Sequence, residues 1–400
     1  MRRLILFILP ILLMCACLDL ENENPYSSDL HTLKVRLLLP DDFSSLPLDS
    51  IAVEFKDNAN GAVFNGISDP EGVIEILLPN GIYSATLAAM IDYERFNGSA
   101  GGIVVDGKDC CADINLLHSR TGDILIKEIY CGGCMKLPAQ GTYNQDSYVM
   151  LHNNTDHTVY LDSLCLATLD PYNSNASTVW TANQISQFAP LIQAIWQFPG
   201  NGTQYPLESG KDAVISIYGA IDHSAQYPLS VNLNRPDYFV CYNPTLFTNT
   251  SYHPAPGDSI RQDHILDLPI KMGKANAFTF SMNSPAVVIF RTQGCPLSEF
   301  ISKSENVIQK PGSDDRIVCL PNDWIMDGVE VFNGQQTNNK KRMSASVDAG
   351  YVTLTNVHES KTLMRKVNAP RSEALGYEVL IDTNNSSTDF YERQTQSLHE

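Results

Sequence analysis

The residues with the clearest chemical potential are two cysteines that enclose a pair of glycines, Cys131-Gly-Gly-Cys134. A short C-x-x-C loop can lower the pKa of one thiol and support redox exchange, and thiolates also bind metals. Redox pairs of this spacing belong with α/β patterns, whereas the sequence around Cys131 predicts strands and loops. We therefore expect a structural disulfide, either within this loop or from it to Cys110 or Cys111. A metal site, a redox pair and free thiols are the alternatives.

Eight cysteines follow Cys17, and an even number in an exported protein favours disulfides. They are Cys110, Cys111, Cys131, Cys134, Cys165, Cys241, Cys295 and Cys319. The sequence does not fix their pairing. The first four lie near the join between two predicted domains, so a bond among them could cross-link that join.

Histidines and carboxylates gather at two places in the sequence. One group lies in a Pro-rich segment and the other flanks a turn: His253, Asp258, Asp263 and His264, then His152, Asp156 and His157. Neutral imidazole and carboxylate are common metal ligands. Solvated polar loops explain both groups more simply, so we predict no metal ligand and no cofactor.

Aromatic residues are frequent in the middle of the chain, where they are Tyr218, Tyr227, Tyr238, Tyr242, Phe247 and Tyr252. Exposed aromatic side chains bind sugars or partner proteins. The competing interpretation is that most of them fill the core of an enlarged domain.

Spacings that mark common active sites are absent from the sequence. There is no Gly-x-Ser-x-Gly elbow, His-Glu-x-x-His pair, phosphate loop or dinucleotide fingerprint, and His358-Glu359 lacks a second histidine. The short basic run Lys340-Lys341-Arg342 is most simply a solvated turn. These observations favour a non-catalytic protein.

The chain of 400 residues is long enough for two domains, and its composition of 43% hydrophobic and 18% charged residues indicates a globular protein. The formal net charge is −18, and it becomes about −20 if a leader containing Arg2 and Arg3 is removed. Nucleic-acid binding needs a basic face, so we predict no nucleic-acid partner.

The N-terminus has the organisation of a secretory signal, with basic Arg2 and Arg3 before an apolar run from Leu4 to Met14 that is too short to span a membrane. The run ends in Met14-Cys15-Ala16-Cys17, which resembles a bacterial lipobox. We expect a signal peptide over residues 1–16 and lipidation of Cys17. Cys15 is the alternative acceptor, and a plain cleaved signal is the alternative to both. The acidic residues after Cys17 resemble the surface-export signal of Bacteroidetes lipoproteins.

Residues 17–31 predict an acidic tether, and residues 32–118 predict a small β-sandwich with period-two alternation in its strands. The turn Asp69-Pro-Glu-Gly72 and the run Leu78-Pro-Asn-Gly-Ile-Tyr83 resemble prealbumin-like sandwiches of the Cna-B and carboxypeptidase-regulatory type. There a D-x-x-G turn precedes a strand and an L-P-x-G-x-Y hairpin follows it. The resemblance implies a spacer without chemistry of its own.

Residues 119–400 predict a larger β domain. Its first strands, from Ile126-Lys-Glu-Ile-Tyr130 to Leu164, resemble the start of a lamin-tail domain with an immunoglobulin-like sandwich. The run Asp382-Thr-Asn-Asn-Ser-Ser-Thr-Asp389-Phe390 resembles its closing turn. In a lipoprotein, both ends together resemble the DUF4876 family of Bacteroidetes, whose function is not established. The chain is longer than a lamin-tail domain, so we expect an insertion at about 170–315.

Within that insertion, Ile185, Phe188, Ile192 and Ile195 fall at near-helical spacing, which predicts a helix over Ala182–Trp196 interrupted by Pro190. Late strands are expected at Val329–Phe332 and Tyr351–Thr355. The overall fold prediction is all-β.

Three Asp-Ser-aliphatic triplets resemble the Bacteroidetes O-glycosylation motif, which points to Ser50, Ser163 and Ser259 as acceptors. Three such short matches could also arise by chance in 400 residues.

The expected function is a non-catalytic lipoprotein of the outer-membrane surface, held to the membrane by its lipid. It would bind either an outer-membrane β-barrel transporter or an extracellular ligand. A protein that binds a metal or a metal complex is the second expectation, and a glycan or cell-wall hydrolase is the third.

Overall fold

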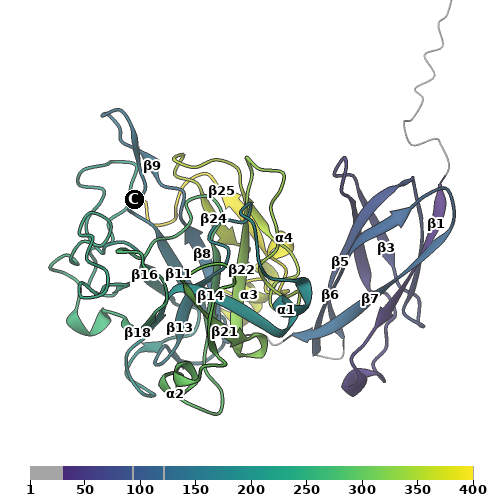
Figure 1. Cartoon of the computed structure of the whole chain (residues 1–400), viewed down its shortest axis with the longest axis horizontal. Helices are drawn as coiled ribbons and strands as arrows, with labels where there is room; N and C mark the ends of the chain where they lie inside the picture. Colours follow the sequence, from purple (N-terminus) through teal and green to yellow (C-terminus); the bar gives the residue numbers. More distant parts are fainter. Residues whose placement is uncertain (1–29, 92–93, 120–121, 400) are drawn as a thin grey trace, which may run out of the picture.

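The structure is a computed structural model that describes residues 30–91, 94–119 and 122–399. It is all-β, as predicted, and consists of two units that follow one another along the chain (Figure 1). No helix in these ranges is long and apolar enough to cross a membrane. The predicted signal peptide, Cys15, Cys17 and most of the tether lie outside the described residues.

The first unit is one seven-stranded sheet in the order β3-β2-β5-β6-β7-β1-β4. Its elements are β1 (His31–Leu38), η1 (Asp41–Phe43), β2 (Ala52–Asp57), β3 (Val63–Ile67), β4 (Val73–Leu78), β5 (Gly81–Ile91), β6 (Glu94–Val105) and β7 (Cys110–Ser119). The sheet curls until its end strands β3 and β4 lie against each other. Buried Leu33, Val35 and Leu37 alternate with exposed residues along β1, so one face forms the core and the other meets water.

The two sequence motifs of this unit adopt different roles. Asp69 Oδ1 accepts hydrogen bonds from the backbone N–H groups of Glu71 and Val73, which builds the expected turn before β4. The Leu78-Pro-Asn-Gly81 run is not a hairpin. Strand β4 pairs with β1 while β5 pairs with β2 and β6, so this run carries the chain from one part of the sheet to another.

The second unit is built on two sheets. The six-stranded sheet has the order β17-β16-β11-β8-β24-β25. Its strands are β8 (Ile124–Tyr130), β11 (Tyr148–Asn153), β16 (Asp212–Ser216), β17 (Phe239–Val240), β24 (Thr362–Arg365) and β25 (Phe390–Arg393). The first strand, β8, therefore lies beside β24, which comes from the end of the chain.

The eight-stranded sheet has the order β20-β21-β14-β13-β19-β22-β23, with β18 beside β14. Its strands are β13 (Cys165–Leu169), β14 (Phe188–Gln197), β18 (Asp267–Lys271), β19 (Ala286–Phe290), β20 (Val307–Gln309), β21 (Arg316–Pro321), β22 (Ile325–Asn333) and β23 (Val352–Leu354). Side chains such as Val149, Trp196 and Ile289 fill one core that both sheets share.

Shorter elements lie in the segments that connect the strands of these sheets. They are the pairs β9 (Cys134–Met135) with β10 (Thr142–Tyr143) and β12 (Val159–Tyr160) with β15 (Pro206–Leu207), and the helices α1 (Ala182–Gln187), η2 (Gln262–His264), α2 (Leu297–Ser302), η3 (Asn322–Trp324), α3 (Ala369–Leu375) and α4 (Ser386–Asp389). Leu297 and Phe300 of α2 pack on the larger sheet. Because both faces of each sheet are covered, strands such as β11, β13 and β19 are buried at every position.

The predicted helix over Ala182–Trp196 is wrong beyond its first six residues. Helix α1 begins at a Thr181–Gln184 capping box and ends at Gln187, after which Phe188–Gln197 is strand β14. A bulge shifts the register of β14, because Thr168 lies opposite Ile192 while Ala167 lies opposite Ile195. The extra residues of the bulge place Ile192 and Ile195, both buried, three positions apart, which imitates the spacing of a helix.

Candidate functional site

A groove of about 900 Å³ lies between the two units, which stand side by side in Figure 1. We call it the inter-unit groove. One wall is the outer face of β2 and β5, which presents Glu54, Lys56, Ser84 and Thr86. The opposite wall comes from β22 and the loop after it, from β23 and the residue before it, and from α4 and β25. Its residues include Phe332, Gln336, Thr337, Tyr351, Ser387 and Glu392.

Two stacked rings form the apolar part of the second wall. The rings of Phe332 and Tyr351 lie 4.0 Å apart and 13° from parallel. Strands β22 and β23 are parallel neighbours, and this pairing brings the two residues together. From the other wall, Lys56 Nζ donates a hydrogen bond of 3.2 Å to the Tyr351 hydroxyl. The rings are half-buried, so part of their surface faces the groove.

The wall around Tyr351 is fixed from behind by Asp348, a fully buried carboxylate. It accepts hydrogen bonds from the N–H groups of Glu330, Gly350 and Ser386 at 2.8, 3.0 and 2.8 Å, and from Ser386 Oγ at 2.7 Å. Burial raises the pKa of Asp348, and Lys341 and these donors oppose the rise. One side chain thus joins β22, the segment before β23 and helix α4.

A glycine is required beside this carboxylate. A Cβ atom on Gly350 would lie 1.9 Å from Asn385 Oδ1, closer than any real contact. Ser387 Oγ also accepts from Tyr351 N at 3.0 Å and donates to Tyr351 O at 2.9 Å. The backbone that carries the Tyr351 ring is therefore held from both sides.

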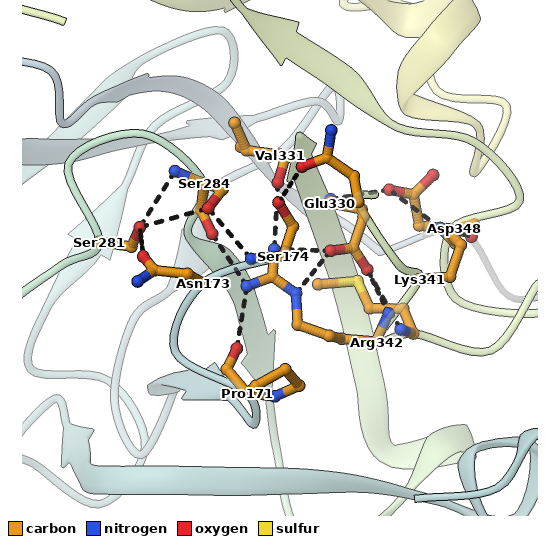
Figure 2. Close-up of polar contacts among 12 residues, drawn as sticks. Pro171, Asn173, Ser174, Ser281, Ser284, Glu330, Val331, Lys341, Arg342 and Asp348 are labelled. Carbon is orange, nitrogen blue, oxygen red and sulfur yellow. Dashed lines mark hydrogen bonds and ion pairs between the residues drawn. The ribbon is translucent and has the colours of Figure 1, made fainter. Parts of the chain in front are cut away.

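Below this wall lies the buried ion pair that Figure 2 shows, between Arg342 and Glu330. Arg342 Nε lies 2.7 Å from Glu330 Oε1, and both side chains are at most 1% exposed. The guanidinium also donates to the carbonyl oxygens of Pro171, Ser284 and Val331 at 2.9–3.1 Å. Four separate segments are joined by one side chain.

The prediction that the Lys340-Lys341-Arg342 run is a solvated turn is therefore wrong for Arg342. Lys341 is half-buried, and its ammonium group donates to the carbonyl oxygens of Asp348 and Gly350. Only Lys340 of the three is exposed. A cationic side chain becomes buried here because Glu330 and several carbonyl groups offer it acceptors.

The closing Asp382–Phe390 run surrounds a second buried cation, Arg365. Its guanidinium contacts Asp327 at 2.5 Å, Asp382 at 3.3 Å and Asp389 at 3.6 Å, and its carbon lies 4.5 Å from the centre of the Phe390 ring. Burial raises the pKa of Asp389 to about 6, while Arg365 opposes that rise. The motif thus has a structural role, and its serines also form part of the groove wall.

The predicted disulfide is not formed in the structure. Cys110, Cys111, Cys131 and Cys134 are all free thiols. Cys110 and Cys111 lie on β7 of the first unit, whereas Cys131 packs in the shared core of the second. The Cys134 thiol instead donates to Asp146 Oδ2 at 3.7 Å.

The chemistry of the Cys131–Cys134 loop is also unlike that of a redox pair. Burial raises the pKa of Cys131 to about 12, and burial together with Asp146 does the same for Cys134. Both thiols stay protonated and unreactive. The glycines explain the spacing, because a Cβ on Gly133, which has φ +73°, would lie 2.1 Å from Tyr143 O. The loop is the tight base of the projecting β9–β10 hairpin (Figure 1).

The histidines of the Pro-rich segment occupy separate places. His253 is buried and stacks on Tyr242, and the Asn243 N–H donates to its Nε2 atom at 2.8 Å. His264 stacks on Phe239 with ring centres 4.2 Å apart. Asp258 and Asp263 are exposed, so these four residues do not form one ligand set.

One set of metal-ligand side chains does converge among the described residues, namely His152, Asp212 and Glu378. A cation already lies there: Lys127 Nζ is 2.5 Å from both Asp212 Oδ2 and Glu378 Oε1. His152 Nδ1 also contacts Asp212 Oδ1 at 2.6 Å. The predicted partners His157 and Asp156 are exposed and pair with each other. The cluster is an internal ion-pair network.

The aromatic residues in the middle of the chain are mostly interior, in agreement with the interpretation that they fill the core of an enlarged domain. Tyr218 and Phe247 are buried, Tyr227, Tyr238 and Tyr242 are half-buried, and Tyr252 is exposed. The ring pair Phe332–Tyr351 was missed, because nothing in the sequence shows that two rings 19 positions apart lie on neighbouring parallel strands. The expected late strands at both positions were the available signal, and both are present as β22 and β23.

The three predicted glycosylation serines share one property in the structure. Ser50, Ser163 and Ser259 are all exposed. Ser50 and Ser163 also adopt positive φ angles of 62° and 59° in turns. These positions are accessible to a modifying enzyme.

Comparison with known proteins places this geometry among related folds. A family model described as "Protein of unknown function (DUF4876)" matches residues 208–397. The crystal structure of a DUF4876 family protein from Bacteroides thetaiotaomicron VPI-5482 is similar, with 22% identity and a TM-score of 0.59, over 90% of this chain and 94% of that one. No curated protein matches the chain.

Two further structures align with lower scores. One is a DUF3823 family protein from Parabacteroides merdae ATCC 43184, with 9% identity over 44% of this chain and 78% of that one and a TM-score of 0.17. The other is GBS52, the minor pilin of Streptococcus agalactiae, with 12% identity over 43% of this chain and 76% of that one and a TM-score of 0.16. These TM-scores support no inference about this chain. The resemblance to the DUF4876 family that was predicted from the sequence is confirmed by the family model, which matches residues 208–397.

Proposed function

We propose that this protein is a non-catalytic, lipid-anchored binding protein of the bacterial cell surface, and that it binds its ligand in the inter-unit groove. The observation that carries this proposal is the groove itself, where polar side chains of both units and the Phe332–Tyr351 ring pair border a volume of about 900 Å³. Ligand sites of proteins are concave, of comparable volume, and often lie between domains.

The supporting wall is pre-organised for binding. Asp348 and Ser387 fix the backbone on either side of Tyr351, and the buried Arg342–Glu330 pair lies beneath. A site whose backbone is already ordered loses less conformational entropy when a ligand binds. The other clusters of ionisable groups, around Arg365 and Lys127, already contain their own cations.

The anchor and the location rest on the sequence. The lipobox resemblance places the lipid on Cys17, and the acidic run after it favours export to the cell surface. Metabolic labelling with a radioactive fatty acid tests this step. Wild type should be labelled and Cys17→Ala should not. Labelling that depends on Cys15 alone would show that Cys15 is the lipidated cysteine. An unlabelled wild type would overturn the anchor.

The binding role is tested by gentle purification of the lipidated protein from native outer membrane, followed by mass spectrometry. A stoichiometric β-barrel transporter would make the protein an accessory of uptake. A solitary protein that retains a small ligand would make it a free-standing binder. Parallel purification of a Thr86→Arg variant, which fills the groove from the first unit, should reduce ligand retention. Equal retention by both proteins would place the ligand elsewhere.

A glycan hydrolase is the competing function that shares this groove, since Glu54 and Glu392 both line it. Incubation with the bound ligand distinguishes the two functions. A binding protein leaves the ligand intact, whereas a hydrolase releases cleaved products that disappear in Glu54→Gln or Glu392→Gln.

A further inference from the structure

We infer that the ligand of the inter-unit groove is a neutral oligosaccharide, one of whose sugar rings packs on the Phe332–Tyr351 pair. This inference deepens the proposed function and rests on it. It follows from the combination of ring stacking, mixed polar groups and local charge balance within a single groove.

The stacked pair leaves half-buried aromatic surface within a polar groove, beside the Lys56 ammonium group, which lies 5.8 Å from the centre of the Tyr351 ring. Phe332 and Tyr351 are nearly parallel at 13°, and Ser387 holds the Tyr351 backbone through both its N–H and its carbonyl group. A pyranose ring has a face of C–H groups and an edge of hydroxyls. Its apolar face suits an aromatic surface of this kind, and its edge needs polar partners around it.

The polar lining can both donate and accept hydrogen bonds. The first unit contributes Glu54 and Thr86, which lie opposite each other in the β2–β5 pair, and the second unit contributes Gln336 and Thr337. A carboxylate, an amide and two hydroxyls match sugar hydroxyls, which act as donor and acceptor at once. An apolar ligand would leave these groups without partners.

The charge of the groove argues for a neutral ligand. The overall charge of −18 disfavours a polyanion such as a sulfated or uronate-rich glycan. Two of the acidic groups are already engaged within the chain. Glu392 Oε1 accepts from Thr355 N at 2.6 Å, and Asp57 Oδ1 accepts from Ala59 N at 2.8 Å. Glu392 also pairs with Lys361 at 3.5 Å, and Lys56 lies beside the ring pair. The three lining carboxylates, Glu54, Asp57 and Glu392, are therefore offset by two cations, and the one remaining negative charge gives little attraction for a cationic peptide.

The groove is also large enough for more than one sugar. Its volume of about 900 Å³ is near the upper end of ordinary ligand pockets, which hold ligands of several rings. The two walls come from different units, so an extended chain can lie between them and contact both.

The test is binding of the purified full chain to an array of neutral glucan, xylan, mannan and galactan oligosaccharides, with sulfated glycans and basic peptides as comparison probes. Calorimetry then measures affinity for each bound probe. We expect at least one neutral oligosaccharide to bind, and Tyr351→Ala to weaken it by about tenfold or more. Tyr252→Ala removes an exposed tyrosine outside the groove and should change affinity less than about twofold.

A second variant is informative if Tyr351→Ala perturbs the fold. Thr86→Arg places bulk in the groove from a half-buried position on β5, and it should also weaken the glycan by about tenfold. Binding of a basic peptide that depends on Tyr351 would overturn the glycan class and leave the groove as the ligand site. Glycan binding that is lost in Tyr252→Ala and kept in both groove variants would place the glycan site outside the groove and overturn this inference. No binding of any neutral oligosaccharide would overturn the glycan inference alone.

Discussion

In the first unit, Lys34 pairs with Glu75 and Arg36 with Asp113 on the wet face of the sheet, where the four side chains are 41–62% exposed. In the second unit, the pairs Arg342–Glu330 and Arg365–Asp327 are at most 2% exposed. Exposed pairs are screened by water and contribute little, whereas a buried charge without its partner is strongly destabilising. The same residue types therefore have different roles in the two units.

The difference follows from how each unit covers its sheets. The sheet of the first unit has one solvent-exposed face, and its backbone groups form hydrogen bonds within a regular sheet. The second unit covers its sheets with long irregular segments, whose carbonyl groups need donors when they are buried. Arg342 supplies donors to the carbonyls of Pro171, Ser284 and Val331 at once. Buried charges thus fix the irregular segments that the groove wall requires.

The largest expected effect separates these two kinds of ion pair. Arg342→Met leaves Glu330 buried without its cation, and we expect a loss of about 3–5 kcal/mol in the free energy of unfolding. Arg36→Ala, the matched exposed change, should leave the free energy of unfolding nearly unchanged, because water screens that pair. Urea unfolding measures both. The double variant Arg342→Met/Glu330→Met should be more stable than Arg342→Met alone, and equal losses in the two single variants would contradict the comparison.

A smaller effect concerns a buried carboxyl without any cation. Asp146 accepts from Ser230 Oγ at 2.5 Å and from the Tyr130 hydroxyl at 3.1 Å, and burial raises its pKa to about 6. The folded state therefore binds this proton more tightly than the unfolded state does. The stability due to this group is fully present below about pH 4 and falls by about 3 kcal/mol as the pH rises to about 6.

Asp146→Asn should remove that slope, as measured by urea unfolding at pH values between 4 and 7. Asp156→Asn is the control, because Asp156 is exposed and its pKa is lowered by His157. A slope that persists unchanged in Asp146→Asn would assign the pH dependence to other groups, such as Asp389.

For the ion-pair network of Lys127, Asp212 and Glu378, we predict that Zn²⁺ raises the free energy of unfolding by about 1–3 kcal/mol once Lys127 is replaced. Lys127→Ala removes the resident cation between Asp212 and Glu378, so Zn²⁺ should bind there and stabilise the variant by mass action. Thermal unfolding with and without Zn²⁺ measures the effect. Wild type should gain no stability, and adding His152→Ala should abolish the gain. Stabilisation of the wild type by Zn²⁺ would instead indicate that the native cluster is a metal site.

The last prediction concerns a reductant, which we expect to have no effect on the stability of the fold. The described cysteines are free thiols, so a reductant should leave the unfolding temperature unchanged. A native disulfide would typically contribute about 2–4 kcal/mol, which reduction would remove. Thiol counting in denaturant should find eight reactive groups between Cys110 and Cys319. A lower count would show that disulfide bonds form in the protein.

Much of the fold was predictable because strand periodicity and turn residues are local signals. The strands of the first unit, the late strands β22 and β23, and the family resemblance all rest on short runs of sequence. The helix at Ala182–Trp196 failed because a bulge in β14 imitates helical spacing. Local patterns cannot show a register shift that depends on the neighbouring strand.

The candidate site was not predictable in the same way. Arg342 sits in a run of cations that is indistinguishable from a surface turn until Glu330 and three distant carbonyls are placed around it. Phe332 and Tyr351 become a pair only through parallel strand pairing, and Lys56 reaches them from another unit. The closing Asp382–Phe390 run was noticed, but its partner Arg365 was not. All of these relations are contacts between residues that are distant in the sequence, so local patterns do not show them.

Strand β8 lies at the start of the second unit, yet its neighbour β24 and the Ser397 groups that hydrogen-bond Glu128 come from the end of the chain. The six-stranded sheet therefore closes only after almost all of the polypeptide has been synthesised. The first unit needs nothing beyond Ser119 to complete its sheet. Until β24 is available, β8 lacks the neighbour that pairs with Glu128 and Ile129. Folds that depend on such long-range pairing form slowly and expose their intermediates to aggregation.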